Sequence, residues 1–312
     1  MPSPTPKKRR RGRIFRFSAA FVVLLAVAGY LVVQYITGGG GGPGCKVVSG
    51  RADGEAYEFT PEQAVNAATI AAVGTGRGMS ERAVTIALAT AIQESGLRNI
   101  EHGDRDSLGL FQQRPSQGWG TRKQILDPTY AAGVFYEHLT KVPGYKTLPL
   151  TVAAQRVQRS GYPEAYAKHE PDATLLSAAL TGHAAATLTC QGRPDTTQAA
   201  TGPDAVRAAL VRDFGRTVLQ EAGAEVSGGS TPTPAASAST KADSGTVTLP
   251  VRSGSKTGWQ LAHWAVANSS ALHIQRVSYA GREWAAGYTN SPWHSTDAKA
   301  KTTGGVRIVT GQ

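Results

Sequence analysis

Cysteine is scarce in this chain of 312 residues, which contains only Cys45 and Cys190. The pair does not have zinc-finger spacing, and neither cysteine has the flanking sequence of a cysteine-dependent peptidase. The histidines likewise lack the spacing of metal ligands; those considered are His102, His138, His169 and His183. We therefore expect neither a metal site nor a cofactor.

Acidic residues are also few, with 22 Asp and Glu against 33 Lys and Arg and a net charge of +11. Seven of these positive charges lie within residues 1–18, which leaves +4 for the remainder. They are Lys7, Lys8, Arg9, Arg10, Arg11, Arg13 and Arg16. The chain has no RNA-binding aromatic motif and no phosphate loop. The charge indicates a partner such as an anionic cell wall or membrane surface, and not a nucleic acid.

One long apolar run occupies residues 19–36, AAFVVLLAVAGYLVVQYI. Its length is at the short end for a transmembrane helix. Because the basic block precedes it, residues 1–18 are expected in the cytoplasm and the bulk of the chain outside the cell, on a single-pass anchor. A cleaved signal peptide is the alternative. The run exceeds a typical signal core and no small-x-small cleavage site follows it, which favours a retained signal-anchor in the cell membrane.

Both cysteines fall on the expected outer side of the membrane, where disulfides persist. They bracket the first globular segment almost end to end. A Cys45–Cys190 bond would stabilise the fold by roughly 4–5 kcal/mol, because it would restrict the unfolded chain. Two unrelated thiols are the alternative.

The chain divides by composition after the anchor. Residues 37–59 are expected to be a Gly-rich tether that leads into the domain, 60–190 a helical domain, and 191–245 a helix with a low-complexity linker. Periodicity and capping residues predict helices over 60–73, 80–95, 127–142, 151–159, 163–169, 171–182 and 203–214. Residues 246–312 predict a small α+β module, with a helix over 259–272 and strands near 247–251, 274–279, 283–285 and 306–310. Its four tryptophans favour a core over a binding surface.

The segment with the clearest chemistry is LATAIQESGLRNIEHGDRDSLGLFQQRPSQGWGT, residues 88–121. Glu94 lies in the last turn of a predicted helix, beside small residues, so its side chain can project into a cleft. An apolar cleft raises the pKa of a carboxyl and keeps it protonated, ready to donate to a glycosidic oxygen. The Gly109–Gln113 run that follows offers amide groups that suit N-acetyl sugars.

This segment resembles the catalytic core of soluble lytic transglycosylases and goose-type lysozymes. Their signature is a Glu-Ser at a helix end and a Gly-Leu-Met-Gln-like run some fifteen residues later, matched here by Glu94-Ser95 and Gly109-Leu110-Phe111-Gln112. The wider string, to ILDPTYAAGVFYEHL, is similar to actinobacterial exported proteins with lysozyme-like domains. The resemblance covers about residues 60–185. It implies a mainly α, lysozyme-like domain, added to the transmembrane helix and the small C-terminal module.

The resemblance also implies the site residues. Glu94 would be the general acid, and the substrate the bond between N-acetylmuramic acid and N-acetylglucosamine in peptidoglycan. The candidates for substrate binding are Ser95, Asp104, Asp106, Gln112, Gln113, Gln158 and Tyr162. The last two stand in for the family's Ala-Tyr-Asn motif, because the corresponding segment AAQRVQRSGYPEAYAKH contains no Tyr-Asn.

The sequence is compatible with three functions. A lytic transglycosylase needs one carboxyl, which acts first as acid and then as base. A hydrolytic lysozyme needs a second carboxylate, which Asp104 or Asp106 would supply unless they only organise their loop. A noncatalytic wall-binding scaffold is the third possibility. The single-carboxyl transglycosylase is the preferred hypothesis.

Overall fold

The computed structural model describes residues 44–51, 54–160, 163–192, 201–216, 245–251, 255–287, 292–296 and 305–311. The expected anchor at 19–36 and most of the expected linker lie outside these residues. Pro43–Gln312 form one compact unit. Among the described residues, no helix has both the length and the apolar character needed to cross a membrane.

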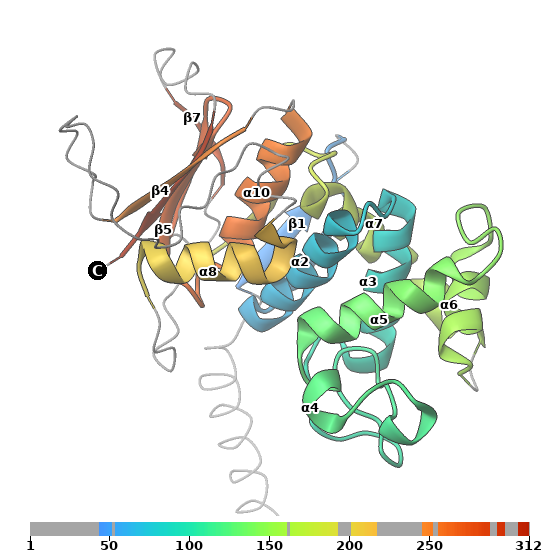
Figure 1. The fold of residues 1–312 in the computed structure, drawn as a ribbon. Helices are drawn as coiled ribbons and strands as arrows, with labels where there is room; N and C mark the ends of the chain where they lie inside the picture. Colours follow the sequence, from blue (N-terminus) through green and yellow to red (C-terminus); the bar gives the residue numbers. More distant parts are fainter. Residues whose placement is uncertain are drawn as a thin grey trace, which may run out of the picture. The chain divides into compact units, whose positions relative to one another are not determined.

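Most of the described helices of this unit lie in its first two thirds (Figure 1). They are α2 (Pro61–Gly76), α3 (Glu81–Ser95), α4 (Arg122–Ile125), α5 (Pro128–Thr140), α6 (Leu150–Gln158), α7 (Glu170–Leu180) and α8 (Pro203–Phe214), with the 3-10 helices η2 (Pro115–Gln117) and η3 (Pro163–His169). The predicted starts of three helices are confirmed: the side chains of Thr60, Ser80 and Asp127 each accept a backbone N–H in the first turn of α2, α3 and α5. Local capping therefore sets where these helices begin.

Two antiparallel sheets accompany the helices. The first has the order β2-β1-β3, from β1 (Cys45–Val48), β2 (Ala56–Phe59) and β3 (Leu188–Cys190). The second has the order β4-β8-β5-β6-β7, from β4 (Thr246–Pro250), β5 (Ile274–Tyr279), β6 (Arg282–Ala285), β7 (His294–Ser295) and β8 (Gly305–Thr310). Helix α10 (Ser255–Ala267) packs on β5 and β8 of this second sheet.

The expected fold class, a mainly α domain with a transmembrane helix and a small added module, is therefore wrong. The described residues hold eight helices and eight strands in two sheets. Part of the error lies in the stretch expected to be a tether, where β1 and β2 form. Strands of three or four residues are too short to display a clear alternation of polar and apolar side chains.

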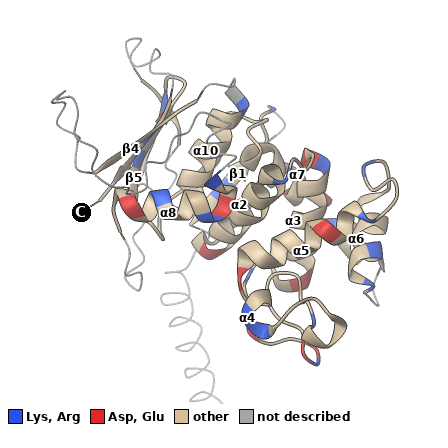
Figure 2. Ribbon diagram, viewed as in Figure 1, with Lys and Arg blue, Asp and Glu red and all other residues tan. Residues whose placement is uncertain are grey.

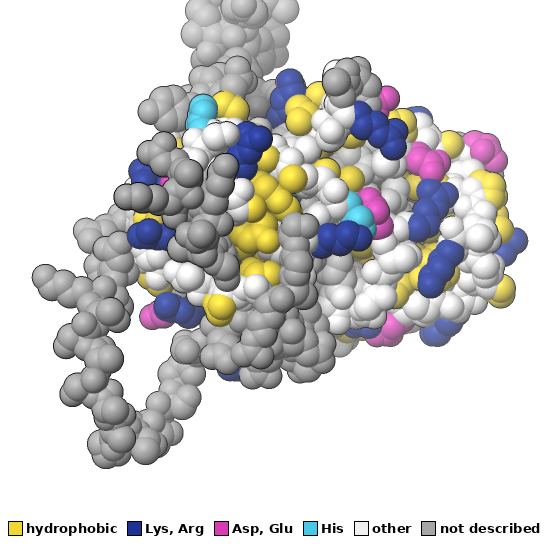
Figure 3. Space-filling view, turned by 90° about the horizontal axis from the view of Figure 1, so that it is seen from above, with side chains coloured by type: hydrophobic (Ala, Val, Ile, Leu, Met, Phe, Trp, Pro, Cys, Tyr) yellow, Lys and Arg dark blue, Asp and Glu magenta, His cyan; other side chains and the backbone are white. Residues whose placement is uncertain are grey.

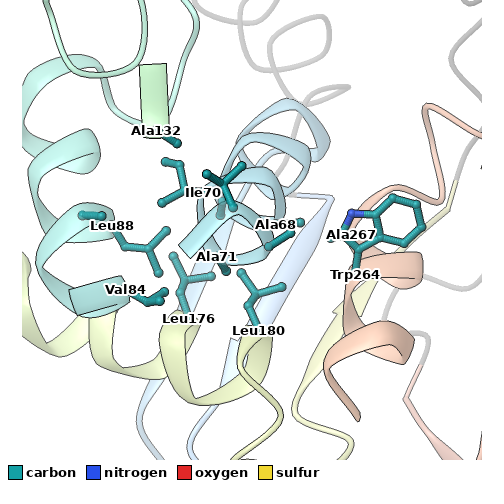
Figure 4. Packing of buried hydrophobic residues seen from close by; sticks show 14 of the residues in the cluster. Ala68, Ile70, Ala71, Val84, Leu88, Ala132, Leu176, Leu180, Trp264 and Ala267 are labelled. Carbon is teal, nitrogen blue, oxygen red and sulfur yellow. The ribbon is translucent and has the colours of Figure 1, made fainter. Parts of the chain in front are cut away.

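Helix α2 is the centre of the unit. It contacts α3, α5 and α7 on one side and α8 and α10 on the other (Figures 1 and 4). Its residues from Asn66 to Gly74 are all buried, and four of these nine are alanines, which lets neighbouring helices approach closely. At Gly74 a Cβ atom would come within 2.6 Å of the hydroxyl oxygen of Tyr136. Because Gly74 has no side chain, the Tyr136 hydroxyl fits at this position and donates to the carbonyl of Ile70 at 3.0 Å.

The C-terminal residues share this core. All four tryptophans expected to form a core are buried: Trp259, Trp264, Trp284 and Trp293. The indole of Trp264 donates to the buried carboxylate of Asp213 at 2.8 Å, which joins α10 to α8. The indoles of Trp284 and Trp293 donate to carbonyls of β3. Two indole groups from the C-terminal residues therefore hydrogen-bond to backbone carbonyls of the first sheet.

The predicted disulfide between Cys45 and Cys190 is confirmed. The two residues face each other in the register of β1 and β3, and the bond spans 145 residues of sequence. It therefore fixes the two ends of the helical region to each other.

His263 gives the fold a dependence on pH. The ring is fully buried; Nε2 accepts the N–H of Thr187 and Nδ1 lies 2.8 Å from the carbonyl of Ala179, which requires a neutral ring. Burial lowers its pKa from 6.5 to about 4, although the Ala179 carbonyl opposes the change. Between these values the unfolded chain binds a proton that the folded chain does not, so stability is lost as the pH falls.

We predict that the free energy of unfolding falls by up to about 3 kcal/mol through this group between pH 6.5 and 4. Urea denaturation across this range measures the loss. The slope should be smaller in His263→Asn and unchanged in His294→Asn, a variant of an exposed histidine. Equal slopes in the wild type and His263→Asn would contradict the assignment.

Candidate active site

Glu94 occupies the last turn of α3, which ends at Gly96 in the left-handed conformation, with φ 62°. The side chain is half-buried. The hydroxyl of Tyr166, from η3, donates to Glu94 Oε1 at 2.6 Å. The amide of Gln158, the last residue of α6, also hydrogen-bonds to the Glu94 carboxylate. Three elements that are distant in sequence thus meet at one carboxyl.

Two opposing effects set the protonation of Glu94. Burial raises its pKa above the usual value, and the hydrogen bonds from Tyr166 and Gln158 lower it in part. Burial is the largest effect, so the net direction is upward and favours the neutral acid. Burial and the bond to Glu94 both raise the pKa of Tyr166, which keeps the phenol protonated as a donor. Burial therefore favours the neutral form of Glu94, and the hydrogen bonds from Tyr166 and Gln158 stabilise the carboxylate once the proton has left.

Ser95 positions the loop opposite Glu94. It is buried, and its hydroxyl lies 2.8 Å from the carbonyl of Leu110 and 3.1 Å from that of Ala91. Gln158 donates to the next carbonyl, that of Phe111, at 2.7 Å. Of the predicted substrate-binding residues, Ser95 is thus placed in the protein interior, where it fixes the loop to the end of α3.

The two glutamines of the GLFQQ run differ in their surroundings. Gln113 is 2% exposed and donates to the carbonyl of Ala131 in α5 at 3.1 Å. Gln112 is only partly buried, has a positive φ of 47°, and donates to the carbonyl of Gly109 at 3.2 Å. At Gly109, where φ is 73°, a Cβ would lie 2.7 Å from the carbonyl oxygen of Ile125. The Gly-Leu-Phe-Gln run is therefore a compact turn, and Gln113 anchors it to α5.

The two aspartates have different roles in the loop. Both oxygens of the Asp106 carboxylate are occupied, one by Arg114 at 2.8 Å and the other by the backbone N–H of Ser116 at 2.8 Å. Arg114 and then Ser116 hold its pKa well below the usual range. Asp104 is exposed, and its backbone carbonyl closes a turn with Ser107. Asp106 thus organises the loop.

The candidate residues from the sequence do not include Tyr166, which lies in the site. Tyr162 lies outside the described residues, and Tyr166 is the one that meets Glu94. A signal was present, because Ala165-Tyr166 matches the first two residues of the family's Ala-Tyr-Asn motif, with Ala167 in place of asparagine. Gln158, the other proposed stand-in, does contact Glu94.

No protein-family model matches the chain, and neither does any curated protein sequence. The chemistry of the site therefore has to be read from its geometry. A raised-pKa carboxyl with two neutral hydrogen-bond donors can give a proton to a leaving oxygen and accept one back. No group of three or more His, Cys, Asp or Glu in the described part of the chain is arranged to hold a metal ion.

One face of the molecule carries charged side chains of both signs. On the face seen in Figure 3, Lys and Arg side chains stand apart from one another, with acidic side chains among them.

We predict that Ser95→Ala lowers the free energy of unfolding by about 1–3 kcal/mol, because the buried carbonyl of Leu110 loses its donor. Ser116→Ala is the matched control: its exposed hydroxyl bonds to Asp106, which keeps its bonds to Arg114 and to the backbone N–H of Ser116, so the effect should stay within about 0.5 kcal/mol. Urea denaturation of both variants tests this, and equal losses would contradict a special role for Ser95.

Proposed function

We propose that this protein cleaves peptidoglycan glycan strands between N-acetylmuramic acid and N-acetylglucosamine as a lytic transglycosylase. The observation that carries the proposal is the half-buried carboxyl of Glu94 under the hydroxyl of Tyr166. The match of Glu94-Ser95 and Gly109-Leu110-Phe111-Gln112 to that enzyme family supports it. The disulfide supports work outside the cytoplasm, where such bonds persist and the wall lies.

In the proposed reaction Glu94 acts twice. Its proton passes to the glycosidic oxygen as the bond from that oxygen to C1 of the muramyl sugar breaks, which releases the N-acetylglucosamine side with a free hydroxyl. The Glu94 carboxylate then removes the proton of the muramyl 6-hydroxyl, whose oxygen attacks C1 and closes an anhydro ring. The proton returns to Glu94, and no water is consumed. Tyr166 and Gln158 stabilise the carboxylate between the two steps.

The state of the aspartates favours this single-carboxyl route over hydrolysis. A hydrolytic lysozyme needs a second carboxylate free to activate water or to attack the sugar. Asp106 has both oxygens committed to Arg114 and Ser116 and a strongly lowered pKa, so it is a poor base. Asp104 is exposed on the loop, and its backbone carbonyl closes the turn to Ser107.

The burial of Glu94 also argues against a noncatalytic scaffold. Withdrawing a carboxyl from water destabilises a protein unless its hydrogen bonds compensate. A wall-binding scaffold gains nothing from that cost, whereas an acid catalyst gains a pKa closer to the pH at which it works.

We predict that Glu94→Gln lowers kcat on purified peptidoglycan at least about 100-fold, because the amide cannot donate the required proton. Mass spectrometry of the products should find anhydro-muropeptides from the wild type. Glu62→Gln, the same change at an exposed position of α2, should leave the rate unchanged. Reducing-end products from the wild type would contradict the transglycosylase, and undiminished cleavage by Glu94→Gln would contradict the role of Glu94.

A second prediction concerns pH. Because the Tyr166 hydroxyl lowers the pKa of Glu94, Tyr166→Phe should raise that pKa further. The acid then stays protonated at higher pH, so the alkaline limb of the kcat/KM profile should move upward in pH. Tyr136→Phe is the control, since it also removes a buried phenol hydroxyl but one that bonds to Ile70. A Tyr166→Phe limb that stays in place or moves to lower pH would contradict the pairing.

A further inference from the structure

A groove of about 590 Å³ opens beside the candidate site, between the ends of α5 and α6 and the loop before α4. Its lining includes Trp119, His138, Lys141, Arg156, Gln158 and Arg159. Its volume lies within the roughly 300–1,000 Å³ of small-ligand sites. The rings of Trp119 and His138 lie 4.1 Å apart and form one wall.

The charge of the groove is of one sign. Lys141, Arg156 and Arg159 are all exposed, and no Asp or Glu lines the groove. Figure 2 shows several blue Lys and Arg segments around α6. None of the three cations forms an ion pair with another described residue, and Glu137 is paired with Arg77 at 3.1 Å. The groove therefore attracts an anion.

Gln158 connects the groove to Glu94. Its side chain is part of the groove lining, and its amide bonds both to the carbonyl of Phe111 and to the Glu94 carboxylate. A ligand in the groove is thus separated from the reacting carboxyl by a single side chain.

We propose that this groove binds the free carboxylates of the peptide branch on the glycan strand, so that the enzyme selects peptide-bearing strands over bare glycan. The inference rests on the proposed function, because it takes the strand to be cut at Glu94. The glucosamine units carry no charge, whereas the branch starts on the muramyl sugar at the bond that is cut and carries carboxylates. Arginine suits such groups, because its planar fork matches a carboxylate.

The first test is binding, and it uses the Glu94→Gln protein so that nothing is cut. Calorimetry compares a muramyl tripeptide that has free carboxylates with the same compound fully amidated. We expect the added changes Arg156→Gln and Arg159→Gln to raise Kd for the free-acid form at least about tenfold and to leave the amidated form unaffected. The matched control is Arg207→Gln with Arg276→Gln, two arginines outside the groove lining that pair with acids.

The second test is cleavage with Glu94 intact. The Arg156→Gln, Arg159→Gln protein should show a raised KM and an unchanged kcat on intact peptidoglycan, and wild-type kinetics on peptidoglycan whose peptide carboxylates are amidated. Unchanged Kd and KM, or equal losses in the control pair, would overturn the inference while the wild type still cuts. Displacement of the tripeptide by equimolar inorganic phosphate would also overturn it, in favour of a phosphate-bearing polymer. In a further outcome the wild type cuts nothing while the two arginine changes still raise Kd for the free-acid tripeptide. That result would support carboxylate binding in the groove and contradict the proposed catalytic activity.

Discussion

The burial of helix α2 on every side is the constraint on which the rest of the unit depends. The alanines between Ala64 and Ala72, together with Gly74, let α3, α5 and α7 pack on one side while α8 and α10 pack on the other. Residues from both ends of the sequence therefore share one core, and the disulfide between β1 and β3 closes the helical region between them. This arrangement fixes the end of α3, and with it the position of Glu94.

The candidate site follows from what the end of α3 meets. Ser95 turns inward and holds the carbonyl of Leu110, so the neighbouring Glu94 is directed toward Tyr166 and Gln158. Burial favours the neutral acid, and the two donors keep the ionised form accessible. A carboxyl balanced in this way suits a reaction in which one group gives a proton and takes one back, and Asp106 remains a structural partner of Arg114.

Local signals in the sequence predicted local structure well and long-range structure poorly. Thr60, Ser80 and Asp127 revealed where helices begin because capping involves only the next three residues. The short strands β1, β2 and β3 went unpredicted, because three or four residues are too few to show alternation. In addition, β3 pairs with β1 across 145 residues. Glu94 was found from its place at a helix end, but Tyr166 lies 72 residues away, and spacing alone does not bring it near. The GLFQQ run predicts both glutamines as sugar contacts, because no pattern in it distinguishes the buried Gln113 from the partly buried Gln112.

Burial raises the pKa of the Glu94 carboxyl above its usual value, so that Glu94 can act as the proton donor. The most direct test of this raised pKa is an NMR titration of the protein labelled with ¹³C at the glutamate side-chain carboxyl, with Glu94→Gln used to assign the signal. The account predicts that the Glu94 resonance titrates at a higher pH than that of the exposed Glu62. A midpoint at or below that of Glu62 would mean that the hydrogen bonds outweigh burial, and would contradict Glu94 as the proton donor.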